Sequence, residues 1–169
     1  MIRVIDDFLR EDEAIGMPHF FSNEFPWHLG TPVYDKKLGN NEKYNFHFGH
    51  LLYDKLTFQS DYFRLVLPIL QILNPSALLK VKANLTTCGE CIVEHGMHTD
   101  NSFKDAFTAI YYVNSNNGYT IFENGEKVDS VKNRLVYFPS HFHHSGTNCT
   151  DEKHRVVINI NYFKDSSQN

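Results

Sequence analysis

The 169-residue sequence lacks the features that mark membrane-spanning and secreted proteins. No apolar run approaches the roughly 18 residues that a bilayer-spanning helix needs, so no membrane partner is expected. The N-terminal stretch turns acidic at Asp6 and Asp7, which is not the pattern of a signal peptide. The three cysteines are an odd number and do not form the paired framework of a small secreted domain. We therefore expect a cytoplasmic protein in a reducing compartment.

The sequence also lacks an excess of positive charge. Its 16 lysines and arginines are outnumbered by 20 aspartates and glutamates, which gives a formal net charge of −4. A general attraction to a phosphate backbone is therefore missing, and this argues against a nucleic-acid partner. No repeat, low-complexity tract or linker interrupts the chain. Because its length is that of one domain, residues 1–169 are predicted to form a single domain.

The chain does contain many short segments of alternating polarity. In the clearest one, Leu79, Val81, Ala83 and Leu85 alternate with polar residues, which is the pattern of a half-buried strand. Turn residues such as Asn114–Gly118 separate further strand candidates. These candidates are residues 106–113, 119–123, 127–131, 134–138, 142–147 and 155–163. Many short strands at this spacing indicate a β-sandwich or jelly roll.

The N-terminal half mixes one strand with helical patterns. Residues 2–5 are predicted to form a first strand, and the acidic residues Glu11–Glu13 open a candidate short helix. Ser60 is a capping residue for a second helix with apolar residues at helical spacing, which Pro68 should kink or break. The predicted fold class is mainly β: a double-stranded β-helix (jelly roll) with a few flanking helices that cover one sheet.

The strongest chemical signal comes from His98, Asp100 and His144. Two histidines and one carboxylate in the order His-x-Asp…His form the facial triad that suits non-haem Fe(II) and leaves coordination positions open. His98 and Asp100 lie two residues apart at the predicted end of a strand, so alternation points both side chains to the same face. We predict that these three residues are the metal ligands and the catalytic centre.

The distal histidine has two neighbours that compete for its role. His141, His143 and His144 lie in one segment, and strand alternation puts the first two on the face opposite to the third. We favour His144 as the ligand. A single histidine is more often a hydrogen-bonded structural residue. His95 and His154 are interpreted in that way, as loop residues or as groups that orient a ligand.

Arg155 follows His144 by eleven residues and begins a strand in which Val157 and Asn159 share its face. An arginine that faces the interior of a small barrel needs a partner, because a buried unpaired charge is costly. Its planar guanidinium can hold a carboxylate through two parallel hydrogen bonds. The far carboxylate of a bound 2-oxo acid is one such partner. The alternative is an arginine at the rim that pairs with an acidic neighbour.

Together these residues resemble the 2-oxoglutarate/Fe(II)-dependent dioxygenase superfamily. The resemblance is closest to the prolyl-hydroxylase-like branch and to its small bacterial and bacteriophage members. The segments that carry it are His98–Asp100, Thr108–Asn114, Gly118–Glu123, Asn133–Phe138, His144–Thr147 and Arg155–Asn159. In the N-terminal half, Phe46–Tyr53 is similar to an aromatic segment that such proteins place near the cavity mouth.

The resemblance implies an oxidoreductase that couples oxidative decarboxylation of 2-oxoglutarate to hydroxylation of a substrate C–H bond, with Fe(II) as metal and O₂ as oxidant. It implies that Arg155 anchors the small-molecule co-substrate 2-oxoglutarate, and that Tyr112 and Asn84 also bind it. Relatives often have a tyrosine where this chain has Thr86. Tyr112 is alternatively a core tyrosine, and Asn84 a solvent-facing strand residue. A peptidyl proline is the leading primary substrate, and a phage-encoded chain would act in the host cytoplasm.

Other interpretations stay open at this point. A cupin-like metal-binding protein without 2-oxoglutarate chemistry would need a glutamate shortly after its paired histidines, and none follows His98 at that spacing. A protein that retains the fold without turnover is a further possibility. The C-x-x-C motif Cys88–Cys91 has three interpretations, as part of a zinc site, as a redox pair or as inert loop thiols.

Overall fold

Two antiparallel sheets make up most of the computed structural model, which describes residues 1–30 and 45–164. The large sheet has the strand order β1-β9-β6-β11-β5-β3-β2, with β4 paired to β3. Its strands are β1 (Arg3–Ile5), β2 (His28–Leu29), β3 (Phe48–Asp54), β4 (Thr57–Phe58), β5 (Pro75–Thr87), β6 (Ala106–Tyr112), β9 (Leu135–Pro139) and β11 (His154–Lys164). The small sheet has the order β10-β7-β8. Its strands are β7 (Tyr119–Phe122), β8 (Lys127–Asp129) and β10 (His144–Gly146).

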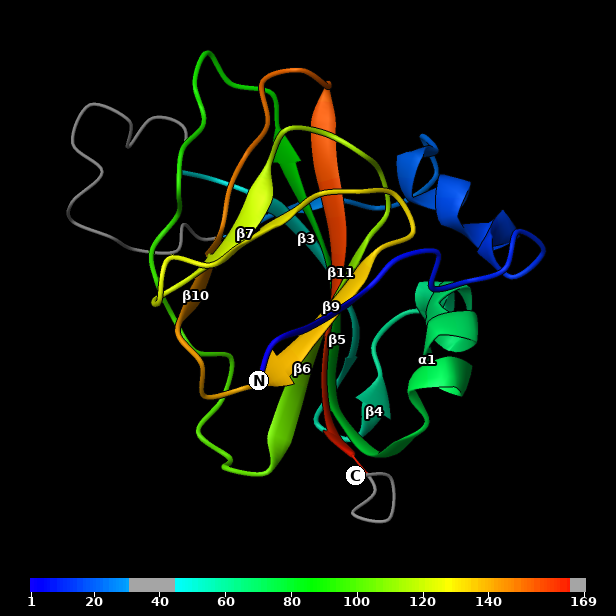
Figure 1. Cartoon of the computed structure of the whole chain (residues 1–169). Helices are drawn as coiled ribbons and strands as arrows, with labels where there is room; N and C mark the ends of the chain where they lie inside the picture. Colours follow the sequence, from blue (N-terminus) through cyan, green and yellow to red (C-terminus); the bar gives the residue numbers. More distant parts are fainter. Residues whose placement is uncertain (31–44, 165–169) are drawn as a thin grey trace.

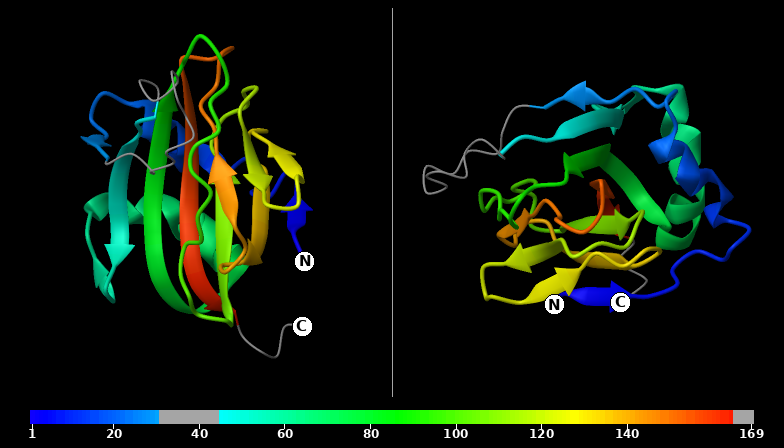
Figure 2. Two further views of the ribbon diagram at one scale, coloured as in Figure 1. Left: turned by 90° about the vertical axis from the view of Figure 1, so that its left-hand side faces the viewer. Right: turned by 90° about the horizontal axis from the view of Figure 1, so that it is seen from above.

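The long strands β5 and β11 form the centre of the large sheet and run side by side over most of its height (Figure 2). Their pairing extends from His154 opposite Thr87 to Lys164 opposite Pro75. Alternation along β11 sends Ile158 and its like-facing neighbours into an apolar core on one side. Arg155 and the residues that share its face point to the other side, toward the small sheet.

Helices cover the apolar face of the large sheet, on the side away from β7 and β10 (Figure 1). They are the 3-10 helices η1 (Ala14–Phe21) and η3 (Asp61–Val66) and the α-helix α1 (Leu67–Leu73). Ser60 caps η3 as predicted, since its hydroxyl accepts a hydrogen bond from the Tyr62 backbone N–H. Pro68 was expected to kink or break this helix. It lies in the first turn of α1, where a missing N–H costs nothing, at the point where the 3-10 helix η3 ends and the α-helix begins. No helix in residues 1–30 or 45–164 combines the length and apolar character needed to cross a bilayer.

The architecture confirms the predicted jelly roll with flanking helices and differs from the prediction in detail. The N-terminal helical segment begins at Ala14 and is a 3-10 helix that contains Pro18. The aromatic segment Phe46–Tyr53 was not predicted as a strand, yet most of it forms β3 beside β5. The strand predicted at 142–147 is shorter and starts at His144. Between the two sheets, a small apolar cluster around Phe122 and Phe138 fills only part of the space.

Candidate functional site

The remaining space between the sheets is a cavity of about 340 Å³. Its wall draws on the polar faces of β5 and β11, on β10, and on the segment that precedes β6. The lining residues are His47, Lys80, Lys82, Asn84, Thr86, His95, His98, Asp100, Ile110, Thr120, His144, Gly146, Thr147, Arg155, Val157, Asn159 and Asn161. Besides Arg155, five residues were predicted to bind the metal or the co-substrate. Four of them, His98, Asp100, His144 and Asn84, line the same cavity as Arg155, and Tyr112 is not among the lining residues.

His98, Asp100 and His144 meet in this cavity. Their ligand atoms all lie within 4.8 Å of one another. His98 Nε2 is 3.8 Å from Asp100 Oδ1, and His144 Nε2 is 4.0 Å from Asp100 Oδ2. Within the described residues this is the one group of histidine, cysteine and acidic side chains that is compact enough to hold a metal ion. Cys88 and Cys91 are exposed and are not part of it.

The rest of each imidazole is fixed by a backbone carbonyl. His98 Nδ1 lies 3.0 Å from the Gly96 oxygen, and His144 Nδ1 lies 3.1 Å from the Phe142 oxygen. A carbonyl oxygen only accepts, so Nδ1 carries a proton, and Nε2 is the ring nitrogen that can bind a metal. Burial lowers the pKa of His144, and the Asp100 carboxylate partly opposes this shift. Both rings are thus oriented as neutral metal ligands are in proteins.

Asp100 is oriented by two side chains from the large sheet. Its Oδ2 accepts hydrogen bonds from Thr108 Oγ1 at 2.7 Å and from Asn161 Nδ2 at 2.9 Å. Thr108 is in turn 3.0 Å from the Ser140 hydroxyl. Two partners on Oδ2 leave Oδ1 without a hydrogen bond from the described residues, so this oxygen is available to a cation.

The backbone that presents the first two ligands is irregular. His98 and Asp100 were predicted at a strand end, but they lie in a segment joined to the small sheet by isolated bridges, Glu94 with Thr147 and His98 with His144. The His98 and His144 backbones exchange both hydrogen bonds at 3.0 Å. This single antiparallel pair, rather than a continuous strand, aligns the two histidines across the cavity.

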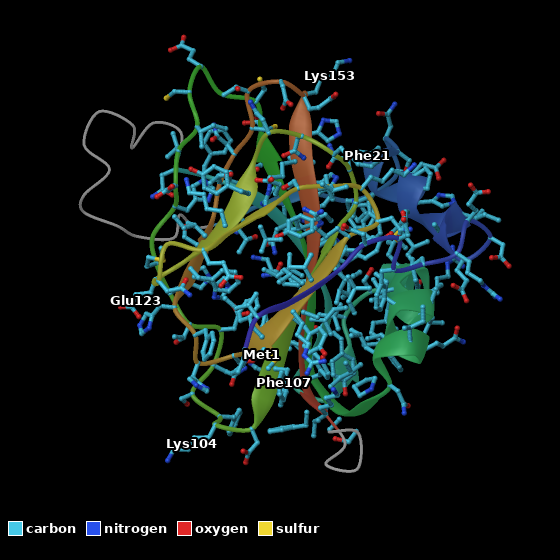
Figure 3. All side chains as sticks on the ribbon, viewed as in Figure 1. Met1, Phe21, Lys104, Phe107, Glu123 and Lys153 are labelled. Carbon is cyan, nitrogen blue, oxygen red and sulfur yellow. The ribbon has the colours of Figure 1, made fainter. Side chains whose placement is uncertain are left out.

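The other histidines of the distal segment point away from the cavity. His143 is exposed, and its Nδ1 is 3.6 Å from the carboxylate of Glu123, which lies at the outer edge of the small sheet (Figure 3). His141 is exposed as well. His144, by contrast, is 2% exposed. His144 is thus the histidine of this segment that lines the cavity, whereas His141 and His143 precede β10 and do not belong to a strand, so alternation along a strand is not what separates them.

Arg155 is buried in the same cavity wall, with 5% of its surface exposed. Its Nε donates to Ser130 Oγ at 2.7 Å and its Nη2 to Thr120 Oγ1 at 3.3 Å. No acidic side chain pairs with it within the described residues, so the rim interpretation does not apply to this part of the chain. A Cβ on Gly118 would lie 2.7 Å from Arg155 Cδ, so the close approach of the arginine requires glycine there. Three of the five guanidinium hydrogens are left for a ligand.

Tyr112 and Asn84 differ in their relation to the cavity. The Tyr112 hydroxyl donates to Thr120 Oγ1 at 2.8 Å, and the side chain is fully buried behind the cavity wall. Tyr112 is thus linked to Arg155 through a shared threonine, and a direct contact with a co-substrate stays a prediction. Asn84 lines the cavity itself, and so does Thr86, whose hydroxyl donates to the Thr147 carbonyl at 3.3 Å.

Several cavity residues were not predicted as functional. His95, interpreted as a loop or orienting residue, lines the cavity with a buried Nε2 that has no hydrogen-bond partner among the described residues. Burial lowers its pKa to about 4, so it is neutral at neutral pH. Lys82 and His47 form a hydrogen-bonded pair at 3.1 Å in another part of the wall. The alternation in β5 was the available signal, since Lys82 and Asn84 share a polar face that proves to line the cavity.

Comparisons with known proteins identify the fold. No protein-family model and no curated protein matches the sequence. Solved structures do match, among them a prolyl hydroxylase from Trichoplax adhaerens in complex with a peptide fragment of the hypoxia inducible factor oxygen degradation domain. That match has a TM-score of 0.65 at 14% identity and covers 99% of this chain and 85% of that one.

Two bacterial structures give the same result. A 2OG-Fe(II) oxygenase family oxidoreductase from Burkholderia pseudomallei has a TM-score of 0.65 at 9% identity and covers 96% of this chain and 85% of its own. A prolyl-4-hydroxylase from Pseudomonas putida has a TM-score of 0.58 at 15% identity, with 96% and 92% covered. At these identities the likeness establishes the fold: the chain has the jelly roll of the 2-oxoglutarate/Fe(II) oxygenases.

Proposed function

We propose that the chain is a non-haem Fe(II) dioxygenase that couples oxidative decarboxylation of 2-oxoglutarate to hydroxylation of a substrate C–H bond. One observation carries the proposal. A single cavity contains a compact group of two histidines and an aspartate, and also a buried arginine that has no acidic partner among the described residues. The first feature suits a metal with open coordination positions, and the second suits a dicarboxylic co-substrate.

The donor set fits Fe(II), since two imidazoles and one carboxylate with room beside them is the arrangement that non-haem iron oxygenases use. His98, Asp100 and His144 would hold the metal. With 2-oxoglutarate and O₂, the bound metal supplies the oxidising chemistry. Thr108 and Asn161 keep the Asp100 carboxylate in one orientation, which lowers the reorganisation needed when a cation binds.

Arg155 would bind the far carboxylate of 2-oxoglutarate through the guanidinium hydrogens that Ser130 and Thr120 do not use. The hydroxyl of Thr120 already accepts from Arg155 and from Tyr112, so its own hydrogen is free to point at a ligand oxygen. Asn84 in the same wall would add an amide contact. Ile110 and Val157 contribute apolar side chains to the cavity wall.

For the primary substrate, the sequence resemblance favours a peptidyl proline. Two of the similar structures are prolyl hydroxylases, and one of them is a complex with a peptide. A peptide is therefore the first substrate class to test. We place the protein in the cytoplasm, on the sequence pattern given above.

The test is the anaerobic addition of Fe(II) and 2-oxoglutarate to the metal-free protein. We expect a weak visible charge-transfer band in the wild type and its loss in His144→Ala. His143→Ala is the matched control, because this neighbouring histidine faces outward and should leave the band intact. A full band in His144→Ala would remove this residue from the proposed ligand set.

Arg155→Ala separates this function from a cupin-like metal-binding protein. The variant should keep its metal but require much more 2-oxoglutarate for uncoupled turnover, measured as succinate release. A metal-dependent activity that is insensitive to both 2-oxoglutarate and Arg155→Ala would instead support the cupin-like alternative.

A further inference from the structure

Lys82 provides a second cation in the cavity wall, apart from Arg155. Its side chain is half-buried, and Nζ donates a hydrogen bond to His47 Nε2 at 3.1 Å. An ammonium group only donates, so His47 Nε2 must be the acceptor and the ring is neutral. Burial also lowers the pKa of His47 to about 4. Across residues 1–30 and 45–164, no carboxylate forms an ion pair with Lys82, so its charge has no counter-charge in direct contact.

The neighbouring strand is shaped to admit this lysine. Gly49 of β3 is the register partner of Asn84, and a Cβ at position 49 would lie 2.5 Å from Lys82 Cε and 3.0 Å from Nζ. The lysine chain therefore lies across the backbone of β3, and a side chain at position 49 would force the flexible end of Lys82 to move. The hydrogen bond to His47 and the partial burial of the side chain place the ammonium in the cavity wall.

The charges in the wall favour an anionic ligand at this point. Of the described lining residues, Lys80, Lys82 and Arg155 are cationic and Asp100 is anionic. The proposed co-substrate would neutralise Arg155, and a metal would add positive charge beside Asp100. Among the described residues Lys82 would still have no carboxylate in direct contact, and a partly buried charge without one is unfavourable.

Asn159 adds a second requirement, for a hydrogen-bond donor on the ligand. It is the cross-strand partner of Lys82, on the same face of the sheet, which puts their Cβ atoms about 5 Å apart. Its Oδ1 is buried and accepts no hydrogen bond from the described residues. This oxygen needs an N–H or O–H donor, because an unsatisfied buried acceptor is costly.

We infer that the primary substrate carries a carboxylate that binds Lys82 Nζ, next to an N–H or O–H donor that binds Asn159 Oδ1. The α-carboxylate of a free amino acid has this chemistry, and so does the C-terminal residue of a peptide. A phosphate group fits less well, since it brings acceptor oxygens to Asn159 and more negative charge than one ammonium balances. The inference rests on the proposed function for the role of this ligand as substrate.

The test uses small probes that contain only the proposed carboxylate and its neighbouring donor, so it does not depend on the identity of the rest of the substrate. Glycine represents a free amino acid and N-acetylglycine a peptide C-terminus. Glycinamide and N-acetylglycinamide are the matched probes without a carboxylate. Their dissociation constants are measured by NMR titration of the full chain, with Zn(II) and saturating 2-oxoglutarate and again without them. The variants are Lys82→Met, Gly49→Ala, and Lys132→Met as the control, an exposed lysine that does not line the cavity.

We expect the wild type to bind at least one carboxylate probe more tightly than its amide. Lys82→Met should weaken that binding about ten- to a hundredfold, the effect of losing one charge-assisted hydrogen bond. Gly49→Ala should weaken it as well, because it displaces the ammonium while keeping every charge. Lys132→Met should bind as the wild type does. The tighter of the two carboxylate probes identifies the source, free amino acid or peptide C-terminus.

Equal affinities in the wild type and Lys82→Met would overturn the inference. Equal losses of affinity in the two lysine variants would also overturn it, because the long-range electrostatic field of the protein, and not a contact with Lys82, would then explain the binding. Tighter binding of inorganic phosphate, or no binding of any carboxylate probe, would overturn it too. A failure of the proposed function would be seen in a different measurement, as a lack of 2-oxoglutarate binding to the wild type. The probe titrations without 2-oxoglutarate would still test the role of Lys82.

Discussion

Replacement of Arg155 by lysine keeps the charge and removes the geometry, so it tests how the co-substrate is held. In the wild type, Nε and one Nη2 hydrogen are engaged by Ser130 and Thr120, while the other guanidinium hydrogens remain for a carboxylate. Lysine places all its donors on one atom. Its ammonium cannot contact both hydroxyls and still offer two parallel hydrogen bonds to a carboxylate.

The expected loss follows from that count. One charge-assisted hydrogen bond contributes about 1.5–3 kcal/mol. Arg155→Lys should therefore weaken the apparent affinity for 2-oxoglutarate about ten- to a hundredfold. Iron content should change little, because Arg155 is not among the proposed ligands.

The assay is a 2-oxoglutarate titration of uncoupled turnover, with iron per chain determined on the same samples. Arg134→Lys is the matched control, since Arg134 forms its bidentate pair with Asp6 near the surface, away from the cavity. We expect the control to titrate as the wild type does. Equal 2-oxoglutarate affinities in Arg155→Lys and the wild type would refute the assignment of Arg155 as the anchor.

Two further predictions concern the metal and pH. Asn161→Ala removes a hydrogen bond to Asp100 and should lower metal affinity about ten- to a hundredfold, measured by competition with a chelator. Gln71→Ala, on the exposed side of α1, is the control and should leave metal affinity unchanged. Unchanged affinity in Asn161→Ala would mean that Thr108 alone orients the Asp100 carboxylate. Burial lowers the pKa of His95 to about 4 from its ordinary 6.5, so between these values the unfolded chain binds more protons than the folded one. The metal-free protein should therefore lose stability as pH falls from 6.5 toward 4, by on the order of 2 kcal/mol from this residue. Chemical denaturation of the wild type and His95→Gln across that range should show a shallower loss in the variant, and parallel curves would contradict the assignment.

Most strands could be predicted because alternation of polarity is a local property of the sequence. This pattern, together with short apolar runs between turn residues such as the run of β6, marked β5, β6, β7, β8, β9 and β11 within a few residues of their observed bounds. It missed β3, where Gly49 and His50 interrupt any simple alternation and where pairing with β5 decides the structure. The N-terminal helix was obscured by Pro18, which a 3-10 helix accommodates.

The site could be predicted only where one short motif contained the information. The spacing of His98 and Asp100 brought these residues to notice, although the strand end expected beneath them is an irregular segment. The supporting contacts of Asp100 had no such signal, because Asn161 lies 61 residues away in the sequence. For Lys82, alternation predicted a polar face but did not distinguish solvent from a polar cavity, since both select the same residue types.

The irregular segment that carries His98 and Asp100 has a thermodynamic consequence. It is held to β10 by isolated bridges, whereas Arg155, Asn84 and Lys82 belong to the long central pair of the large sheet. Segments with few backbone hydrogen bonds open at a lower free energy than a continuous ladder does. Whenever the metal-free chain has its three ligands assembled only part of the time, the measured dissociation constant for iron exceeds the intrinsic one by the inverse of that fraction. The proposed iron would then stabilise only the wall that contains His98 and Asp100. Chains without the metal would keep Arg155, Asn84 and Lys82 in place for organic ligands.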